Sequence, residues 1–365
     1  MKNLLVIFVD SLPYQYALQM PIAKHFSTQL PLTPGFGYSI NIQAELFSGK
    51  MPDELEYFSE WTYAGTDSPF RKYRMLFNVL SPSSKVYLID RILHRIGNKI
   101  FGPIWNIPFR YLPYLKNQPD IFSQEYTIPS IFTQIPELQV IKYPDFSYPD
   151  RDDKMTLAGL TTMETHPQLF IGLVDLDGIT HGVGVGSPEY LIALERLNAN
   201  LDKLLNKYTK LFPDGKMIIV SDHGMANVTG SIELILEKEF GRVNPTSYFY
   251  IQDSTMLRIW TFTDKKRKEI EQFLDHQPYG KIVTDDERAK YKLTSSKFGD
   301  IIFLLNEGLV FSPSFYGRKL PKAMHGYHPE LASQQGVLLY NNPLPSDLGS
   351  MQRTTKVYRL ISTII

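Results

Sequence analysis

Residues 4–10 read Leu-Leu-Val-Ile-Phe-Val-Asp, a short apolar run that ends on a carboxylate. Such a run is typical of a strand in the middle of a parallel sheet, covered on both faces. The pattern returns at residues 168–177 and 216–223, where apolar runs again lead into aspartate. Between these two runs, residues 188–205 carry leucines at helical spacing. Strands that alternate with helices predict an α/β fold with a mostly parallel central sheet flanked by helices.

The composition excludes several classes of protein. The 365 residues hold 38 lysines and arginines against 38 aspartates and glutamates, whereas proteins that bind nucleic acid generally carry a basic excess. We therefore expect no nucleic-acid polymer as a partner. The chain has no cysteine, which excludes disulfides, cysteine nucleophiles and thiolate-bound metals. Any metal ion would have to be held by histidine and carboxylate side chains.

Two segments interrupt the alternation of strands and helices. Residues 53–125 are rich in aromatic and basic side chains, and we interpret them as a cap inserted into the core. Residues 229–320 predict several strands and a helix of their own, and we interpret them as a small α+β insertion. The core would then consist of residues 1–52, 126–228 and 321–365.

Within the cap, residues 86–101 predict an amphipathic helix with one apolar and one mainly basic side. Such a helix favours peripheral contact with a membrane surface. Two alternatives are that its apolar side packs on the core, and that the cap stacks a nucleobase. The first apolar run is too short for a signal peptide, and no segment reaches the length of a transmembrane helix. We expect a cytoplasmic protein that is either soluble or peripheral to a membrane.

Carboxylate and imidazole side chains follow the apolar runs at four places. These are Asp10, Asp177 with His181, Asp222 with His223, and His325. Ligands of an open α/β sheet bind at the carboxyl ends of its strands, so we expect these side chains to meet there. Three carboxylates and three imidazoles suit one or two divalent cations, and imidazole favours zinc or another transition metal. Each piece alone also fits an ordinary turn, including Ser-Asp-His-Gly-Met at 221–225 with an N-cap aspartate.

The order of these motifs resembles the alkaline phosphatase superfamily, and within it the type I phosphodiesterase/nucleotide pyrophosphatase branch. The resemblance covers the three core segments and rests on Asp10, a hydroxyl residue before a helix, Asp177-Gly-Ile-Thr-His181, Ser221-Asp-His-Gly-Met225 and His325-Gly-Tyr327. It implies two metal sites, with zinc or manganese as the ions. One site would use Asp177, His181 and His325, and the other Asp10, Asp222 and His223, with the nucleophile between them.

The resemblance also implies a nucleophile nine residues before the hydroxyl of a Thr-Gly-x-x-Pro segment. That segment here is Ser48-Gly-Lys-Met-Pro52, so the nucleophile, which would also contact the metals, is Ser39. A serine at a helix start lies beside free backbone N–H groups that favour phosphate, and a nearby divalent ion favours its alkoxide. An ordinary N-cap is the alternative interpretation. Thr33, Ser48 and Ser11 are rival nucleophiles.

Other side chains have competing interpretations. Asp175 could replace Asp177 as a ligand or orient it, since the sequence places both on one strand face. His328 is a rival of His325. Asn41 is a candidate substrate-binding residue, because its amide could hydrogen-bond a phosphate oxygen.

Together these assignments predict an enzyme that hydrolyses a phosphodiester or pyrophosphate bond. Ser39 would attack phosphorus in line, with two metal ions about 4 Å apart, and a phosphoseryl intermediate would then be resolved by water. The expected substrate is a phosphodiester or a nucleotide-like molecule. Resolution by an alcohol would instead make the protein a phosphotransferase acting on a lipid- or glycan-linked phosphodiester, and phosphomonoesterase activity is a further alternative.

Overall fold

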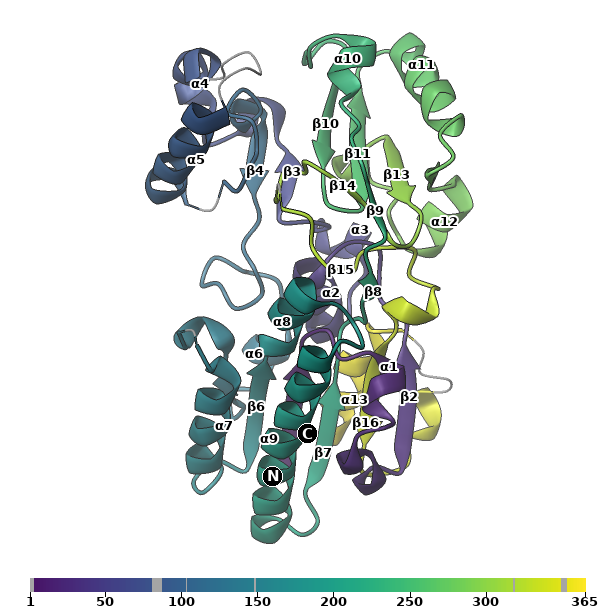
Figure 1. Ribbon diagram of the computed structural model, residues 1–365. Coiled ribbons are helices and arrows are strands. Elements are labelled where there is room, and N and C mark those ends of the chain that lie inside the picture. The colour runs from purple at the N-terminus through teal and green to yellow at the C-terminus, as the bar shows by residue number, and fades with distance from the viewer. Residues whose placement is uncertain (1–2, 81–86, 103, 148, 318, 349–352) are drawn as a thin grey trace. The chain divides into compact units, whose positions relative to one another are not determined.

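A six-stranded sheet forms the centre of one of the two compact units in the computed structural model of the chain (Figure 1). The structure describes residues 3–80, 87–102, 104–147, 149–317, 319–348 and 353–365. The core unit consists of Met1–Leu55, Pro119–Val228 and Pro321–Ile365, and the insert unit of Glu56–Gln118 and Thr229–Leu320. The two segments that interrupt the core in the sequence therefore belong to the same unit.

The sheet of the core unit is mostly parallel, as the sequence predicts. Its strand order is β2 (Thr28–Leu32), β16 (Gly336–Tyr340), β7 (Lys216–Val220), β1 (Leu4–Val9), β6 (Gln168–Leu173) and β5 (Gln139–Ile141). β1 pairs in parallel with β6 and β7, and β5 with β6, whereas β16 runs antiparallel to both of its neighbours. Every residue of β1 is fully buried, which explains why this strand has no polar side chain.

Alternate residues of β6 identify the two faces of the sheet. The ring of Phe170 packs against Phe47 and Phe132, with centroids 5.3 and 4.8 Å away. The next residue, Ile171, points to the opposite face, where it lies so close to Gly159 that a side chain there would clash. Helices therefore cover both faces. The first group contains α2 (Ser39–Ser48), α6 (Ile131–Gln134) and α13 (Lys356–Ile364), and the second contains α7 (Arg151–Thr162), α8 (Asp175–Val183) and α9 (Pro188–Leu211).

Several elements of the core unit are not predicted from the sequence, and β2 and α7 show why. Strand β2 contains Pro31, which a central strand could not accommodate, but β2 pairs only with β16 and so forms an edge. Helix α7 has a weakly amphipathic sequence that includes Gly159, and tertiary packing rather than propensity keeps it helical. Four shorter elements complete the unit: α1 (Tyr14–Ala17), α3 (Pro52–Leu55), β8 (Ala226–Asn227) and β15 (Ala323–Met324).

The insert unit is built on an antiparallel sheet with strand order β10 (Tyr248–Gln252), β11 (Met256–Thr261), β13 (Ile301–Leu305) and β12 (Gly280–Ile282). Its other elements are β3 (Trp61–Tyr63), α4 (Arg74–Leu80), α5 (Tyr87–Phe101), β4 (Leu115–Asn117), β9 (Gly230–Ile232), α10 (Leu236–Phe240), α11 (Asp264–Asp275), α12 (Asp285–Lys290) and β14 (Leu309–Phe311). Tyr111 of the first segment packs on Phe249 of the second, with ring centroids 5.1 Å apart, in a hydrophobic cluster that both segments share.

The insert unit buries one ion pair within its core. Arg258 Nε donates to Asp253 Oδ2 at 2.8 Å, and both side chains are almost completely inaccessible to solvent. The guanidinium also donates to the carbonyl of Trp61 at 2.8 Å and to the hydroxyl of Ser59 at 3.1 Å. Partners within the protein therefore surround this buried charge.

The side of α5 that packs on the core of the insert unit is not the side that its apolar pattern predicts. His94 is buried and its Nε2 lies 2.9 Å from the carbonyl of Ile107. In contrast, Ile92, Ile96 and Ile100 are 49%, 49% and 66% exposed. The interpretation that the whole apolar side packs on the core is wrong for these three residues. Across the part of the chain that the structure describes, no helix is both long and apolar enough to span a membrane.

Candidate active site

The six predicted metal ligands all lie at the carboxyl-terminal side of the central strands of the core unit. Asp10 directly follows β1. Strand β7 is followed by Ser221 and then by Asp222 and His223. Asp177 and His181 lie on α8, which begins two residues after β6. Because residues four apart on a helix share a face, both side chains point the same way.

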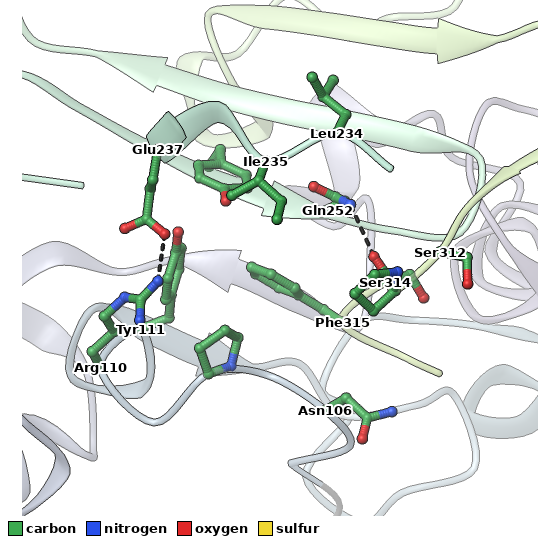
Figure 2. Close-up of a pocket in the computed structure, with 13 residues that line it drawn as sticks. Asn106, Arg110, Tyr111, Leu234, Ile235, Glu237, Gln252, Ser312, Ser314 and Phe315 are labelled. Carbon is green, nitrogen blue, oxygen red and sulfur yellow. Dashed lines mark hydrogen bonds and ion pairs between the residues drawn. The ribbon is translucent and has the colours of Figure 1, made fainter. Parts of the chain in front are cut away.

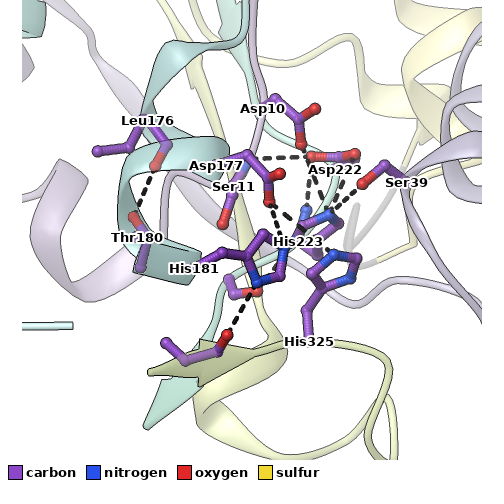
Figure 3. A network of polar contacts seen from close by, with 12 residues as sticks. Asp10, Ser11, Ser39, Leu176, Asp177, Thr180, His181, Asp222, His223 and His325 are labelled. Carbon is purple, nitrogen blue, oxygen red and sulfur yellow. Dashed lines mark hydrogen bonds and ion pairs between the residues drawn. The ribbon is translucent and has the colours of Figure 1, made fainter. Parts of the chain in front are cut away.

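The structure brings these side chains into two groups (Figure 3). In the first group, Asp177, His181 and His325 each offer one ligand atom, and the three atoms lie within 4.8 Å of one another. The second group consists of Asp10, Asp222 and His223, whose ligand atoms also lie within 4.8 Å of one another. The rings of His223 and His325 stack with centroids 3.8 Å apart, so the two groups are neighbours. Residues from distant parts of the sequence therefore converge as predicted, while their metal-binding role stays a prediction.

Hydrogen bonds to the protein fix the orientation of two imidazoles. Nδ1 of His223 lies 2.9 Å from the carbonyl oxygen of Gly224, and Nδ1 of His181 lies 2.8 Å from that of Ala323. A carbonyl can only accept, so Nδ1 carries the proton in each ring, and Nε2 presents a lone pair to the group. A ligating histidine is usually held in this way.

The carboxylates of both groups leave oxygen atoms without a hydrogen-bond donor. Among the described residues, Asp10 Oδ1, Asp177 Oδ1 and Asp222 Oδ2 are buried and have no hydrogen-bond partner. Asp10 Oδ1 lies 3.6 Å from Nε2 of His223, and Asp222 Oδ2 lies 3.5 Å from the same atom. When both carboxyl groups are ionised, these are contacts between acceptors, which repel one another unless a cation lies between them.

A transition-metal ion would fit these contacts. Ligand atoms bonded to a tetrahedral zinc at about 2.0–2.1 Å lie about 3.3 Å apart. Nε2 of His181 and Oδ1 of Asp177 are 3.5 Å apart, close to that spacing. The donors are nitrogen and oxygen only, which suits zinc or manganese. The residues present are therefore compatible with two divalent cations.

Burial and mutual repulsion shift the acid–base behaviour of this site strongly. Burial, followed by repulsion from Asp222 and Asp177, raises the pKa of Asp10 well above its usual value. Burial also raises the pKa of Asp222 to about 7, although backbone N–H groups oppose the shift. Burial lowers the pKa of His223 to about 4, so its imidazole is neutral at neutral pH, as metal binding requires.

The predicted nucleophile, Ser39, lies beside the two groups of candidate metal ligands. Its Oγ is 2.8 Å from Nε2 of His223, an atom that accepts because Nδ1 carries the proton. Ser39 is the first residue of α2, and Tyr38 occupies the N-cap position, so the interpretation of Ser39 as an ordinary N-cap is wrong. The N-terminus of this helix also directs backbone N–H groups to the same place.

The rival nucleophiles have other positions. Ser48 closes α2 and donates its hydroxyl proton to the carbonyl of Ala44, within the helix. Thr33 forms a backbone bridge with Arg353. Ser11 adopts a left-handed backbone conformation with φ of 62°, and its backbone N–H donates to Asp222 Oδ1 at 3.3 Å. Ser11 therefore supports the site through its backbone.

Asn41 does not have the predicted role in binding substrate. Its Oδ1 accepts from the backbone N–H of Tyr38 at 2.8 Å, and its Nδ2 donates to the carbonyl of Phe36 and to Glu45 Oε1. The side chain is fully buried. Both amide protons are already used within the protein, so none remains for a phosphate oxygen. Asn41 instead fixes the loop that leads into α2, where Gly37 has a φ of 113° and leaves the space that the amide fills.

The two alternative ligands are likewise directed elsewhere. Asp175 and Asp177 lie on a helix rather than on a strand, so their side chains point in different directions. Asp175 pairs with Nε of Arg151 at 3.2 Å. Nδ1 of His328 accepts from the backbone N–H of Glu330, and neither residue belongs to the two groups.

Two residues that support the candidate active site are not predicted from the sequence. Gln43 lies one helical turn after Ser39, is buried, and its side chain hydrogen-bonds to Asp222. Gly224 packs so tightly against the carbonyl of Ser333 that any side chain would clash. The sequence does contain a signal for Gln43, because it is a polar residue four positions after the predicted nucleophile at the start of the helix.

A cavity lies within the insert unit, apart from the candidate metal ligands (Figure 2). This cavity has a volume of about 450 Å³ and is lined mainly by Tyr111, Tyr250, Phe315 and proline side chains. Its charged groups, Arg110 and Glu237, form an ion pair. None of its lining residues belongs to the two groups of candidate metal ligands.

Comparison with protein families gives a match over residues 59–328 to type I phosphodiesterase / nucleotide pyrophosphatase. The chain belongs to this family. The protein is therefore a hydrolase of the metal-dependent phosphodiesterase class, and the predicted family is confirmed. The matched range includes five of the six candidate ligands, while Asp10 and Ser39 precede it.

Solved structures show the same fold. Murine ectonucleotide pyrophosphatase / phosphodiesterase 5 aligns with 100% of this chain and 95% of its own, at 17% identity and a TM-score of 0.60. An inactive variant of the murine protein in complex with AMP aligns with the same coverage and identity, at a TM-score of 0.61. The human protein aligns with 100% and 94% coverage, 18% identity and a TM-score of 0.58. A search of curated proteins by sequence finds no match.

Proposed function

We propose that the protein hydrolyses a phosphodiester or pyrophosphate bond of a nucleotide-like substrate, with Ser39 as the nucleophile. The observation that supports this most strongly is the position of Ser39 Oγ, 2.8 Å from His223 within a cluster of acceptors that lack donors. Two divalent cations, zinc or manganese, would be held by Asp177, His181 and His325 and by Asp10, Asp222 and His223. When bound, they supply positive charge that favours the serine alkoxide and the departing oxygen.

Ser39 carries the covalent step. Its oxygen attacks phosphorus, an Oγ–P bond forms, and the bond from phosphorus to the leaving alcohol or phosphate breaks. The proton of the Ser39 hydroxyl passes to solvent water, and the leaving oxygen departs with the electron pair and takes up a proton from solvent. A water molecule then attacks the same phosphorus, which releases the second product and returns Ser39 to its hydroxyl form. The N-terminus of α2 offers backbone N–H groups to the phosphate oxygens during both steps.

A comparison of variants tests this proposal. With zinc or manganese present, wild-type protein should hydrolyse bis(p-nitrophenyl) phosphate faster than p-nitrophenyl phosphate, because the proposed activity is that of a phosphodiesterase. Ser39→Ala should lower turnover by about 10⁴-fold or more, as expected for loss of a nucleophile. Ser48→Ala changes the other candidate serine of the same helix and should retain turnover.

Acid quenching during turnover, followed by mass spectrometry, should find p-nitrophenyl phosphate esterified to Ser39. Full activity in Ser39→Ala, or an adduct on another residue, would contradict the proposal. Addition of glycerol distinguishes the alternative reaction, since a phosphotransferase would form a glycerol ester in preference to the hydrolysis product. A faster rate with p-nitrophenyl phosphate would instead favour a phosphomonoesterase.

A further inference from the structure

The α4–α5 region of the insert unit exposes the most concentrated group of large apolar side chains among the described residues. Met75 and Val79 of α4 are 85% and 81% exposed, and Leu76 is 48% exposed. On α5, Ile92, Ile96 and Ile100 recur every four residues and form one exposed stripe. We call these six residues the apolar patch.

The helices are held in place by other side chains, so the exposure of the patch does not result from loose packing. Phe77 of α4 is fully buried and packs against Phe101 of α5, with ring centroids 5.4 Å apart. On α5, Gly97 lies against Ile104 and Phe109 so closely that a side chain would clash. One side of each helix is thus fixed in the core of the insert unit, and the apolar patch remains outside.

Positive charge predominates in the sequence around the apolar patch. Between residues 68 and 117 the sequence has a single acid, Asp90, against nine basic residues: Arg71, Lys72, Arg74, Lys85, Arg91, Arg95, Lys99, Arg110 and Lys116. Of these, Arg71, Lys72, Arg74, Arg95 and Lys99 are exposed on or directly before the two helices. An apolar surface with a basic border matches an anionic lipid surface, where the apolar groups enter the interface and the cations meet phosphates.

Helix α4 also lines a basic cleft. Its volume is about 660 Å³, and Arg74 and Asn78 of α4 line it together with Arg110, Tyr114 and Arg242. The pairing of Arg110 with Glu237 satisfies one of these guanidinium groups, as Figure 2 shows. Among the described residues, Arg74 and Arg242 have no carboxylate partner. Two cations with no counter-ion in a cleft of this size suit the phosphate of a lipid headgroup.

We propose that the insert unit docks on an anionic membrane surface, with the apolar patch in the interface and lipid phosphates in the basic cleft. A second copy of the chain is a poorer occupant, since two such faces would bring like charges together. The proposal does not depend on Ser39 or on the metals, because it concerns binding and not hydrolysis.

Vesicle binding by the full chain tests this inference. Cosedimentation with vesicles of phosphatidylcholine and phosphatidylglycerol, at 7:3, should exceed that with phosphatidylcholine alone. Binding should weaken in 0.5 M NaCl, because salt screens the basic residues. The double variant Ile96→Glu/Ile100→Glu should lower the affinity by about tenfold or more, since both side chains would enter the interface.

Matched variants serve as controls. Ile192 of α9 is 64% exposed, so Ile192→Glu makes the same change elsewhere and should leave binding intact. Arg74→Glu/Arg242→Glu should weaken binding by more than about 25-fold, because each lost positive charge costs about fivefold and each new glutamate adds repulsion. Lys268 is exposed on α11, so Lys268→Glu, which introduces the same charge into the same unit, should have little effect.

Several results would overturn the inference. One is equal binding to both kinds of vesicle, and another is equal loss of binding in Ile192→Glu and in the double isoleucine variant. Binding of glycerol 3-phosphate in the cleft, without any vesicle binding, would assign the cleft to a soluble anion. A dimer of the wild type that Ile96→Glu/Ile100→Glu converts to a monomer would assign the patch to a second copy. Thermal melts distinguish all of these results from unfolding.

Discussion

The two units each bury charged groups, and they treat them in opposite ways. In the insert unit, Arg258 and Asp253 satisfy each other, and the guanidinium also donates to Trp61 and Ser59. In the core unit, Asp10 Oδ1 and Asp222 Oδ2 face Nε2 of His223, and neither of these two oxygens receives a hydrogen bond. The first arrangement is complete within the chain, whereas the second needs a proton or a cation to complete it. Buried charge therefore has a structural role in the insert unit, and in the core unit we propose that it binds a metal ion.

The largest expected effect is on the insert unit. Arg258→Met should lower the free energy of unfolding by about 3–5 kcal/mol, because it leaves the Asp253 carboxylate buried without its counter-ion. Arg196 of the core unit pairs with Asp150 and Asp153 at the surface, so Arg196→Met should cost about 1 kcal/mol or less. Urea unfolding of the two variants measures the difference. Equal costs would show that the buried pair is not the stabilising feature described above.

Addition of metal should stabilise the core unit. Zinc at 100 times its dissociation constant should raise the free energy of unfolding by about 2.7 kcal/mol for one site. Asp222→Asn should reduce this gain, since it removes a charged ligand. Asp214→Asn, at an exposed position, should keep it. Thermal melts with and without zinc measure the gain, and equal gains in both variants would contradict the assignment of Asp222.

Without metal the same variant should have the opposite effect. Burial raises the pKa of Asp222 from 3.8 to about 7, so ionisation of this group destabilises the fold progressively as pH rises between these values. Asparagine keeps an oxygen that can accept from the N–H groups of Ser11 and His223. Chelated Asp222→Asn should therefore be about 1–3 kcal/mol more stable than wild type at pH 8, with a smaller gain at pH 5. No gain at pH 8 would mean that the empty site carries no repulsion.

Proton release on metal binding is the smallest expected effect. At pH 6, zinc should displace about one proton from the Asp222 carboxyl, because its pKa is about 7. At pH 8.5 the release should be smaller, since Asp222 is then ionised and His223, with a pKa of about 4, is already neutral. Calorimetry in buffers of different ionisation enthalpy measures this number. More protons released at pH 8.5 than at pH 6 would contradict the assignment.

Much of the core unit could be predicted from the sequence. β1 is uniformly apolar, and β6 and β7 are apolar after their first residue, because both faces of these strands are buried. Candidate ligands follow each of the three strands in the sequence. The convergence of Asp10 and Asp222 was also predictable, because they follow the neighbouring parallel strands β1 and β7, whose carboxyl ends lie at one edge of the sheet. His325 follows β15, which lies outside this sheet.

What the sequence could not provide depends on contacts between distant residues. The shared core of the insert unit joins Tyr111 to Phe249, and no local pattern indicates that pairing. The residue type of Asn41 predicts a hydrogen bond to a phosphate oxygen of the substrate. Its actual partners are backbone groups, which only the folded loop brings next to it. On α5 the apolar pattern indicated the wrong side, since Gly97 and His94 rather than the isoleucines pack on the core.

The most direct test of the central claim is a crystal structure of zinc-loaded protein with anomalous diffraction recorded at the zinc edge. We predict two peaks for each chain. One should be bound by Asp177, His181 and His325, and the other by Asp10, Asp222 and His223, with Ser39 Oγ beside them. A single peak, or ions elsewhere that leave these carboxylate oxygens without a ligand, would contradict the account.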